Sequence, residues 1–423
     1  MLPFLAPELR LNITRFVDRP TLPALCLASL DWLSPAQAKL FQDLYVHLHD
    51  RSAQDAIHFL ESHSHLRISV THLYIFGDPW STYSRLDKEN LFVLLGLLPV
   101  ICNVTLDRVQ IARSPSIIGD PVPQGAHLKL VLSRSLMDKT MLDILLTRLR
   151  VTELHLPSLR LEASDGPLLP LFRPEMFKSI RRLNIGRVNT YLAPRTEWRT
   201  SDILAVCSDV LKSLGVGYDL YEYVYGEVLY RFLQEKGRHI ESLTIDYGSS
   251  TKIDYETRIL PLLFDEDGGG MPPEWPDIIL SSCCPSLTHI TLVLSVVNGS
   301  SDYMKNHAAV FLWQYAMRLL ATAPKTLRSI ILLLYMDGYF SPQDRVGNTI
   351  VRVDWKNWDE MLKGFDMLEG LTFVAVKDET FGEEYFEMYQ KQSEVSSEWL
   401  QLASEFVFEK LPSLYGRDVL RFM

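Results

Sequence analysis

Histidines are the first residues whose spacing suggests chemistry. Six of the eleven histidines lie between His47 and His72, and imidazole is a common zinc ligand. The stretch His58-Phe-Leu-Glu-Ser-His63 places a carboxylate between two histidines, as zinc proteases do, but the two imidazoles are five positions apart. On a helix they would point about 140° apart, whereas residues at i and i+4 share one face. We therefore expect surface or strand-edge histidines and no metal site.

Glycine and acidic motifs give no better candidate for a catalytic or nucleotide-binding site. Gly215-x-Gly217 follows a predicted strand but lacks the third glycine of a dinucleotide-binding turn, and Asp265-x-Asp267 is not continued as a calcium loop. The run Asp267-Gly-Gly-Gly270 is not followed by the Lys-Ser/Thr pair that binds phosphate. A Gly-x-Ser-x-Gly turn is also missing from the sequence. The sequence predicts no catalytic residues, no cofactor and no enzyme activity.

The distribution of charged residues indicates which kinds of molecule the chain could bind. The net charge is −10, and lysines and arginines are not clustered, so binding to the phosphates of a nucleic acid is not expected. Residues 354–409 hold 14 Asp and Glu against 4 Lys and Arg, so this segment accounts for the whole net charge. We interpret it as a solvated helical face, and a docking surface for a basic partner is the alternative.

Composition predicts a soluble protein of the cytoplasm or nucleus. No run of about 18 uncharged apolar residues is present, so no membrane span is expected. Glu8 and Arg10 interrupt the first apolar stretch too early for a signal peptide. The five cysteines are odd in number and lie mostly in apolar runs, which is typical of buried thiols in a reducing compartment.

Three short helices are predicted in the first 41 residues. Pro7 suits the first position of a helix, because its φ is fixed and it has no N–H to leave unpaired. One face of that helix carries Leu9, Ile13, Phe16 and Val17. Thr21 is the predicted cap of a second helix. Ser34-Pro35 is the predicted start of a third helix, which runs through Phe41.

These helices carry more apolar surface than they can bury among themselves. Of the first 41 residues 23 are apolar, a larger share than the 47% of the whole chain. A unit of about 40 residues is also near the lower size limit for independent folding. The second apolar face must therefore be covered, either by the rest of the same chain or by a partner protein.

The same stretch resembles the F-box, in the F-box-like form of a large fungal family. The matching positions are Leu5, Pro7-Glu8-Leu9, Ile13, the Thr-Leu-x-x-Leu-Cys-Leu-x-Ser run at 21–29, Trp32-Leu33 and residues 38–41. The resemblance also covers residues 59–75 and, more loosely, residues 411–421. In that family the module opens a chain of about this length whose remainder is divergent leucine-rich repeats.

The resemblance implies a substrate-recognition subunit of an SCF-type cullin-RING ubiquitin ligase. The F-box-like module would bind the S-phase-kinase-associated adaptor, and the repeats would bind a protein target. The residues expected to bind the adaptor are Leu5, Pro7, Leu9, Ile13, Leu25 and Trp32. The competing interpretation is a non-catalytic leucine-rich-repeat interaction scaffold that recruits no ligase.

One pattern recurs along the rest of the chain: an apolar residue, two others, and then an apolar-x-apolar triplet. Its copies lie at 70–75, 101–106, 151–156, 180–185, 211–216, 240–245, 287–292, 327–332 and 368–373. Helical patterns fill the gaps, and a strand plus a helix per repeat is typical of leucine-rich repeats.

We therefore predict an α/β fold. A three-helix F-box-like module (1–44) is followed by an irregular leucine-rich-repeat solenoid (45–423), with a curved parallel sheet inside and helices outside. Residues 383–410 are predicted to form an acidic helix, and about 378–423 a helical cap. A mixed α/β domain with a parallel sheet is the structural alternative.

Target binding is predicted on the inner face of that sheet. Strand side chains alternate, so the middle residue of each triplet, and the residue just after the triplet, point away from the core. We therefore expect six residues to lie on or beside one continuous surface: His155, Arg182, Asn184, Thr244, Asp246 and His289. The irregular, exposed loop 265–276 is the alternative target contact, since long insertions often carry binding.

Overall fold

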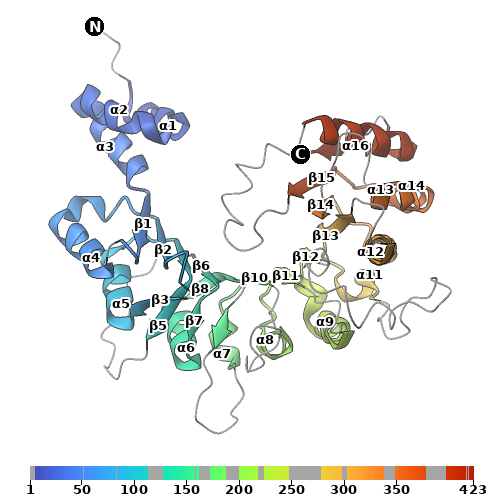
Figure 1. Ribbon diagram of the computed structural model, residues 1–423, viewed down its shortest axis with the longest axis horizontal. Helices are drawn as coiled ribbons and strands as arrows, with labels where there is room; N and C mark the ends of the chain where they lie inside the picture. The colour runs from blue at the N-terminus through green and yellow to red at the C-terminus, as the bar shows by residue number, and fades with distance from the viewer. Residues whose placement is uncertain are drawn as a thin grey trace. The chain divides into compact units, whose positions relative to one another are not determined.

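Figure 1 shows the computed structural model of the chain. The structure describes residues 5–50, 52–81, 83–112, 127–157, 159–161, 172–186, 200–217, 223–246, 278–297, 303–337, 348–377, 397–415, 417 and 419–423. The chain divides into two compact units, Met1–Arg181 with Val188–Asp202, and Arg182–Arg187 with Ile203–Met423. The predicted boundary between residues 44 and 45 lies inside the first unit.

An N-terminal module of three helices opens the first unit. It consists of α1 (Pro7–Phe16), the 3-10 turn η1 (Arg19–Thr21), α2 (Leu22–Ala28) and α3 (Leu30–Leu40). The predicted start of the third helix at Ser34 is wrong, because α3 begins at Leu30 and Pro35 lies inside it. A proline inside a helix has no N–H for the carbonyl four residues earlier, so the Asp31 carbonyl needs another donor.

The rest of the first unit contains a series of strands that pair in parallel in one sheet. The strands lie in the order β1 (Asp43–His47), β2 (His72–Phe76), β4 (Asn103–Asp107), β6 (Leu128–Ser133) and β8 (Val151–Leu156). The helical elements that accompany them are α4 (Ala53–Ser62), η2 (Ser64–Leu66), α5 (Lys88–Leu97), α6 (Lys139–Arg148) and α7 (Pro174–Phe177). The helices cover one face of these strands (Figure 1).

A second, short parallel sheet in the first unit was not predicted. It contains β3 (Ser84–Asp87), β5 (Val109–Ala112), β7 (Leu136–Met137) and β9 (Arg160–Leu161). Each of these strands follows a strand of the main sheet in the sequence, and tight turns lead from β4 to β5 and from β6 to β7. Both turns contain an arginine in the left-handed region, Arg108 with φ 54° and Arg134 with φ 44°. The sequence gives no warning of such turns, because glycine or asparagine is the usual residue there.

The second unit repeats the same arrangement. Its strands lie in the order β10 (Arg182–Ile185), β11 (Ser213–Gly217), β12 (Ser242–Asp246), β13 (His289–Val297), β14 (Ser329–Asp337), β15 (Gly370–Lys377) and β16 (Leu420–Phe422). Its helical elements are α8 (Thr200–Val206), α9 (Tyr223–Lys236), η3 (Gly237–His239), α11 (Leu280–Cys283), α12 (Tyr303–Ala321), α13 (Asn348–Arg352), α14 (Trp355–Leu362), α16 (Ser397–Lys410) and η5 (Pro412–Leu414).

The core consists of apolar rows that run across the strands. In the first unit Leu73, Val104, Leu130 and Leu154 pair in register, and none is more than 1% exposed. In the second unit the matching row is Leu183, Leu214, Leu243, Ile290, Ile330 and Leu371, all at 2% or less. All of these residues except Leu130 are the first residues of the predicted triplets. The predicted parallel sheet of strand–helix repeats is therefore confirmed, as in a leucine-rich-repeat solenoid.

The C-terminal segment packs on the last long strand. β16 pairs in parallel with Leu371–Phe373 of β15. Asp359 of α14 accepts a hydrogen bond from the backbone N–H of Ser413 at 2.9 Å, and α16 contacts α14. Of the predicted acidic helix 383–410, the described part is α16; residues 383–396, like loop 265–276, lie outside the described residues.

The close approach of two turns gives a test of the first unit. A Cβ on Gly77 would lie 2.1 Å from the carbonyl oxygen of Arg108, a backbone atom that cannot rotate away. We expect Gly77→Ala to lower the free energy of unfolding by about 3 kcal/mol. Gly96→Ala in α5 is the matched control, because no atom lies within 4 Å of its added methyl group. The control is expected to be neutral or to stabilise by up to about 1 kcal/mol, since alanine favours helices. Equal effects in urea unfolding would contradict the turn packing.

Candidate interaction surfaces

Helix α1 exposes its apolar side chains to solvent and buries two polar ones against the module. Arg10 is 6% exposed and Thr14 is 1% exposed, and these two residues lie one turn apart on the same face. Leu9 is 52% exposed, Ile13 42% and Phe16 90%. A surface helix normally has the opposite polarity. The apolar face that the sequence predicts for α1 is real, but it points away from the module's own core.

Arg10 supplies the hydrogen bonds that hold this arrangement. Its Nε donates to the Leu5 carbonyl at 2.8 Å, and its Nη1 donates to the Asp31 carbonyl at 2.9 Å. The same Nη1 lies 3.1 Å from Asp31 Oδ1. Buried arginines are stable only when they are paired, and here the partners come from the residue Leu5 before α1 and from α3.

The structure separates the six predicted adaptor-binding residues into two groups. Leu5, Pro7, Leu9 and Ile13 are exposed, whereas Leu25 and Trp32 are half-buried. Three residues that the sequence reasoning did not select are more exposed still: Phe16, Leu27 at 88% and Leu30 at 87%. The surplus of apolar residues in the first 41 positions was the sequence feature that could have identified them, since helices this short cannot bury every leucine. We call Leu5, Leu9, Ile13, Phe16, Leu27 and Leu30 the α1 surface.

On the first unit's main sheet, the face away from the helices carries a charged cluster. Glu153 Oε1 lies 2.7 Å from His155 Nε2 and 2.9 Å from Lys129 Nζ. The hydrogen bond from His155, helped by Lys129, lowers the pKa of Glu153 to about 2. His155, a predicted target-binding residue, is thus half-buried and hydrogen-bonded to Glu153.

Aromatic rings cover the same face at β1 and β2. Tyr45 stacks on Tyr74 with ring centres 4.8 Å apart, and His47 stacks on Phe76 at 5.3 Å. The Arg19 guanidinium lies 5.3 Å from the centre of the Tyr45 ring. These rings pack mainly against one another, as cross-strand pairs do, so they stabilise the first two strands and form no open cage.

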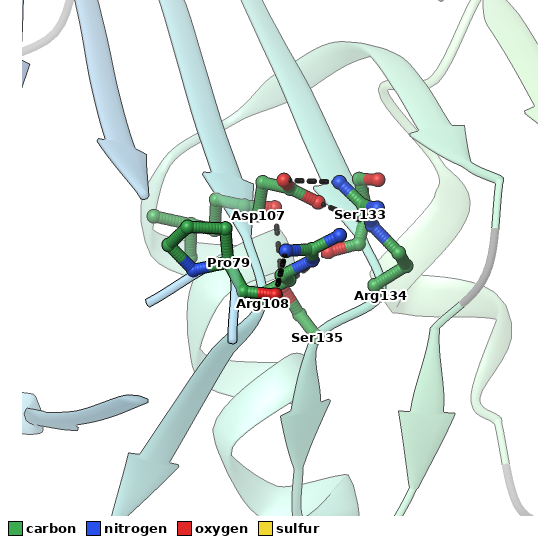
Figure 2. Close-up of polar contacts among 7 residues, drawn as sticks. Pro79, Asp107, Arg108, Ser133, Arg134 and Ser135 are labelled. Atoms are coloured by element: carbon green, nitrogen blue, oxygen red, sulfur yellow. Dashed lines mark hydrogen bonds and ion pairs between the residues drawn. The ribbon is translucent and has the colours of Figure 1, made fainter. Parts of the chain in front are cut away.

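A polar cluster fixes the strand ends of the first unit. Figure 2 shows the Asp107 carboxylate facing Arg134, whose Nε and Nη2 donate at 3.0 and 2.5 Å. Arg108 donates to the Pro79 carbonyl at 2.6 Å, and the buried Ser135 hydroxyl donates to the Leu106 and Ser133 carbonyls. Burial and the nearby Arg134 lower the pKa of Arg108. We assign this cluster a structural role, because each group has a partner within the turns.

In the second unit, the predicted target-binding residues share one sheet face. Arg182 and His289 lie in one row across β10 to β13, and Asn184 and Thr244 lie in the next. Between the last two, the Asn184 side chain lies over Gly215, where an added Cβ would be 2.9 Å from Asn184 Oδ1. Position 215 is therefore a glycine because a side chain there would collide with Asn184. Arg182 and His289 are exposed, and Asn184, Thr244 and Asp246 are half-buried.

The row of this face that contains Asp246 becomes apolar beyond β12. Val293, Leu333 and Val374 lie in register with Asp246, and Val293 and Leu333 are 4% and 9% exposed. Ile331 packs against them. The strands β13 to β15 are also the longest, and their nearly continuous apolar runs are typical of strands buried on both faces.

The described residues hold no other site with recognisable chemistry. No group of three or more potential metal ligands occurs among them, and none of their helices could cross a membrane. All five cysteines are free. Burial raises the pKa of Cys207 and of Cys284 to about 12, so neither is a reactive thiolate at neutral pH.

Comparisons with known proteins add little. No protein-family model and no curated protein matches the chain. A solved structure of the leucine-rich repeat-containing protein LegL7 from Legionella pneumophila is similar at 13% identity and TM-score 0.35, over 78% of this chain and 93% of that one. A TLR13–ssRNA13 complex is similar at 12% identity and TM-score 0.32, over 73% of this chain and 36% of that one. Such scores carry no inference, so the repeat assignment rests on the strand register.

The Glu153 cluster predicts a pH dependence. A lowered carboxyl pKa stabilises the folded chain above the ordinary pKa of about 4.5, and this contribution is lost as the pH falls toward 2. We expect Glu153→Gln to lower the free energy of unfolding at pH 7 by about 1–2 kcal/mol, a value reduced for solvent screening. The difference from wild type should shrink as the pH falls from 5 to 3. Glu241→Gln, in an exposed pair with Lys212, is the control and should change stability by less than about 0.5 kcal/mol. A pH-independent difference would contradict the assignment.

Proposed function

We propose that this chain is a substrate-recognition subunit of an SCF-type cullin-RING ubiquitin ligase. Its N-terminal module would bind the S-phase-kinase-associated adaptor, and its repeats would bind a protein target. The observation that carries the proposal is the reversed polarity of α1, which buries Arg10 and Thr14 and exposes Leu9, Ile13 and Phe16. The resemblance of this stretch to the F-box supplies the identity of the partner.

The energetics of the α1 surface favour a bound partner. Each Å² of apolar surface left in water costs about 25 cal/mol. Exposed apolar groups that gather on one small module are typical of an interaction site. A stable interface covers about 800 Å² on each partner and depends on a few aliphatic or aromatic anchors. Phe16, Leu27 and Leu30, each at least 87% exposed, are candidate anchors on the same module.

The repeats suit the second part of the proposed function. A ligase receptor needs no catalytic residue, because holding the target raises the effective concentration of its lysines near the conjugating enzyme. In the second unit, Arg182, Thr244 and Asp246 lie on one sheet face that none of the described helices covers. The proposal involves no cofactor and no nucleic acid, and it places the chain in the cytoplasm or nucleus with the adaptor.

An interaction scaffold that recruits no ligase is the alternative function. The observation in its favour is that Leu25 and Trp32 are half-buried within the module, so part of the F-box-like pattern serves the module's own packing. Binding of the purified adaptor distinguishes the two functions.

The α1 surface gives the first test. We expect the double substitution Leu9→Asp with Ile13→Asp to weaken binding of the purified adaptor at least about 100-fold, because two charges would enter an apolar interface. Both positions are exposed, so the free energy of unfolding should change by less than about 0.5 kcal/mol. Ile68→Asp is the control, since Ile68 is 69% exposed outside the module. Titration calorimetry measures the affinity. Wild-type binding by the double variant would contradict the proposed surface.

The sheet face of the second unit gives the second test. We expect Arg182→Glu with Asp246→Lys to weaken target capture several-fold and to leave adaptor affinity unchanged, because the two positions lie in a different unit from the module. The measurement is quantitative mass spectrometry of proteins that copurify with each variant, after thermal stability has been matched. A variant with 265–276 replaced by a short Gly-Ser linker is the comparison. Loss of capture in that variant alone would assign recognition to the insertion.

A further inference from the structure

Helix α3 contains a backbone carbonyl that its own sequence leaves without a helical donor. In a regular helix the Asp31 carbonyl would accept from the N–H of residue 35, but that residue is Pro35. A backbone carbonyl that loses its helical partner is satisfied by another donor in folded proteins. The Arg10 guanidinium, from α1, donates to this carbonyl at 2.9 Å.

The rotation of α1 about its axis depends on the same contact. Leu9 and Ile13 precede Arg10 and Thr14 by one residue each, which is a rotation of about 100° on the helix surface. Hydrophobic burial alone would turn Leu9 and Ile13 inward. The hydrogen bond of Arg10 to Asp31 joins α1 to α3 in the orientation that leaves these apolar side chains exposed.

We propose that Arg10 is a positioning residue for the α1 surface, which it acts on through its hydrogen bond to the Asp31 carbonyl. The inference rests on the proposed function, because it assigns Arg10 to the orientation of the adaptor-binding face. Arg10 is 6% exposed, so we assign it an effect on the orientation of α1 and no direct contact with the adaptor.

Four variants of the full chain test this role. They are Arg10→Met, Pro35→Ala, the double variant and Arg15→Met, in which an exposed arginine of the same helix is the matched control. Calorimetry with the purified S-phase-kinase-associated adaptor measures affinity, urea unfolding measures stability, and hydrogen exchange measures the opening of α1. If Arg10→Met does not fold, Arg10→Lys takes its place. Lysine keeps the charge but lacks the planar guanidinium, which donates to two carbonyls at once.

Arg10→Met is expected to weaken adaptor binding about tenfold, while Arg15→Met and Pro35→Ala stay within about twofold of wild type. In the double variant, Pro35→Ala restores a backbone N–H that can pair with the Asp31 carbonyl, so the unfolding midpoint should recover while the affinity stays about tenfold weak. Recovery of affinity together with stability would overturn the proposal, because Arg10 would then only satisfy a carbonyl. Wild-type affinity in Arg10→Met would overturn it as well.

The failure of the proposed function is distinguishable from the failure of this inference. If the wild-type chain does not bind the adaptor, the proposed function is wrong, and hydrogen exchange alone decides the role of Arg10. About tenfold faster exchange of the α1 amides in both Arg10→Met and the double variant, but not in Arg15→Met, would support positioning. Unchanged exchange in α1 would overturn it.

Discussion

The burial of one apolar row across neighbouring strands is the constraint on which each unit depends. A single strand–helix repeat cannot bury its apolar edge, whereas residues such as Leu214, Leu243 and Ile290 are buried once their strands pair in register. A shift of one residue would turn every row to the wrong face. The alternation of the repeated triplet is therefore both the signal in the sequence and the force that sets the register.

Polar groups adapt to that register and do not set it. Asp107 and Arg134 pair where two main strands end, and Asn184 lies over Gly215 because a side chain there would collide with it. Such contacts join adjacent strands at positions that the apolar rows hold in register. They also explain why single glycines and charged pairs in this chain are better understood as packing features than as ligand sites.

In the N-terminal module a polar contact, and not an apolar row, determines the arrangement. The module is too small to gain much from a core, so its arrangement depends on a buried arginine that satisfies a carbonyl left open by Pro35. The result is a module whose apolar side chains Leu9, Ile13 and Phe16 face water. A folded unit that keeps such a surface is suited to binding a partner, and the repeats behind it are suited to holding another protein.

The sequence by itself determined the parallel strand–helix repeats and the existence of three N-terminal helices, because apolar periodicity and proline are local signals. It could not determine which face of α1 is buried, since Leu9 and Arg10 compete through partners as distant as Asp31. The second sheet could not be predicted for a similar reason. The left-handed backbone of Arg108 and Arg134 depends on contacts with neighbouring strands, such as the hydrogen bond from Arg134 to Asp107. The burial of Val293 and Leu333 on the face away from the helices likewise follows from strand neighbours. Tertiary structure decided these features because each depends on contacts between residues far apart in the chain.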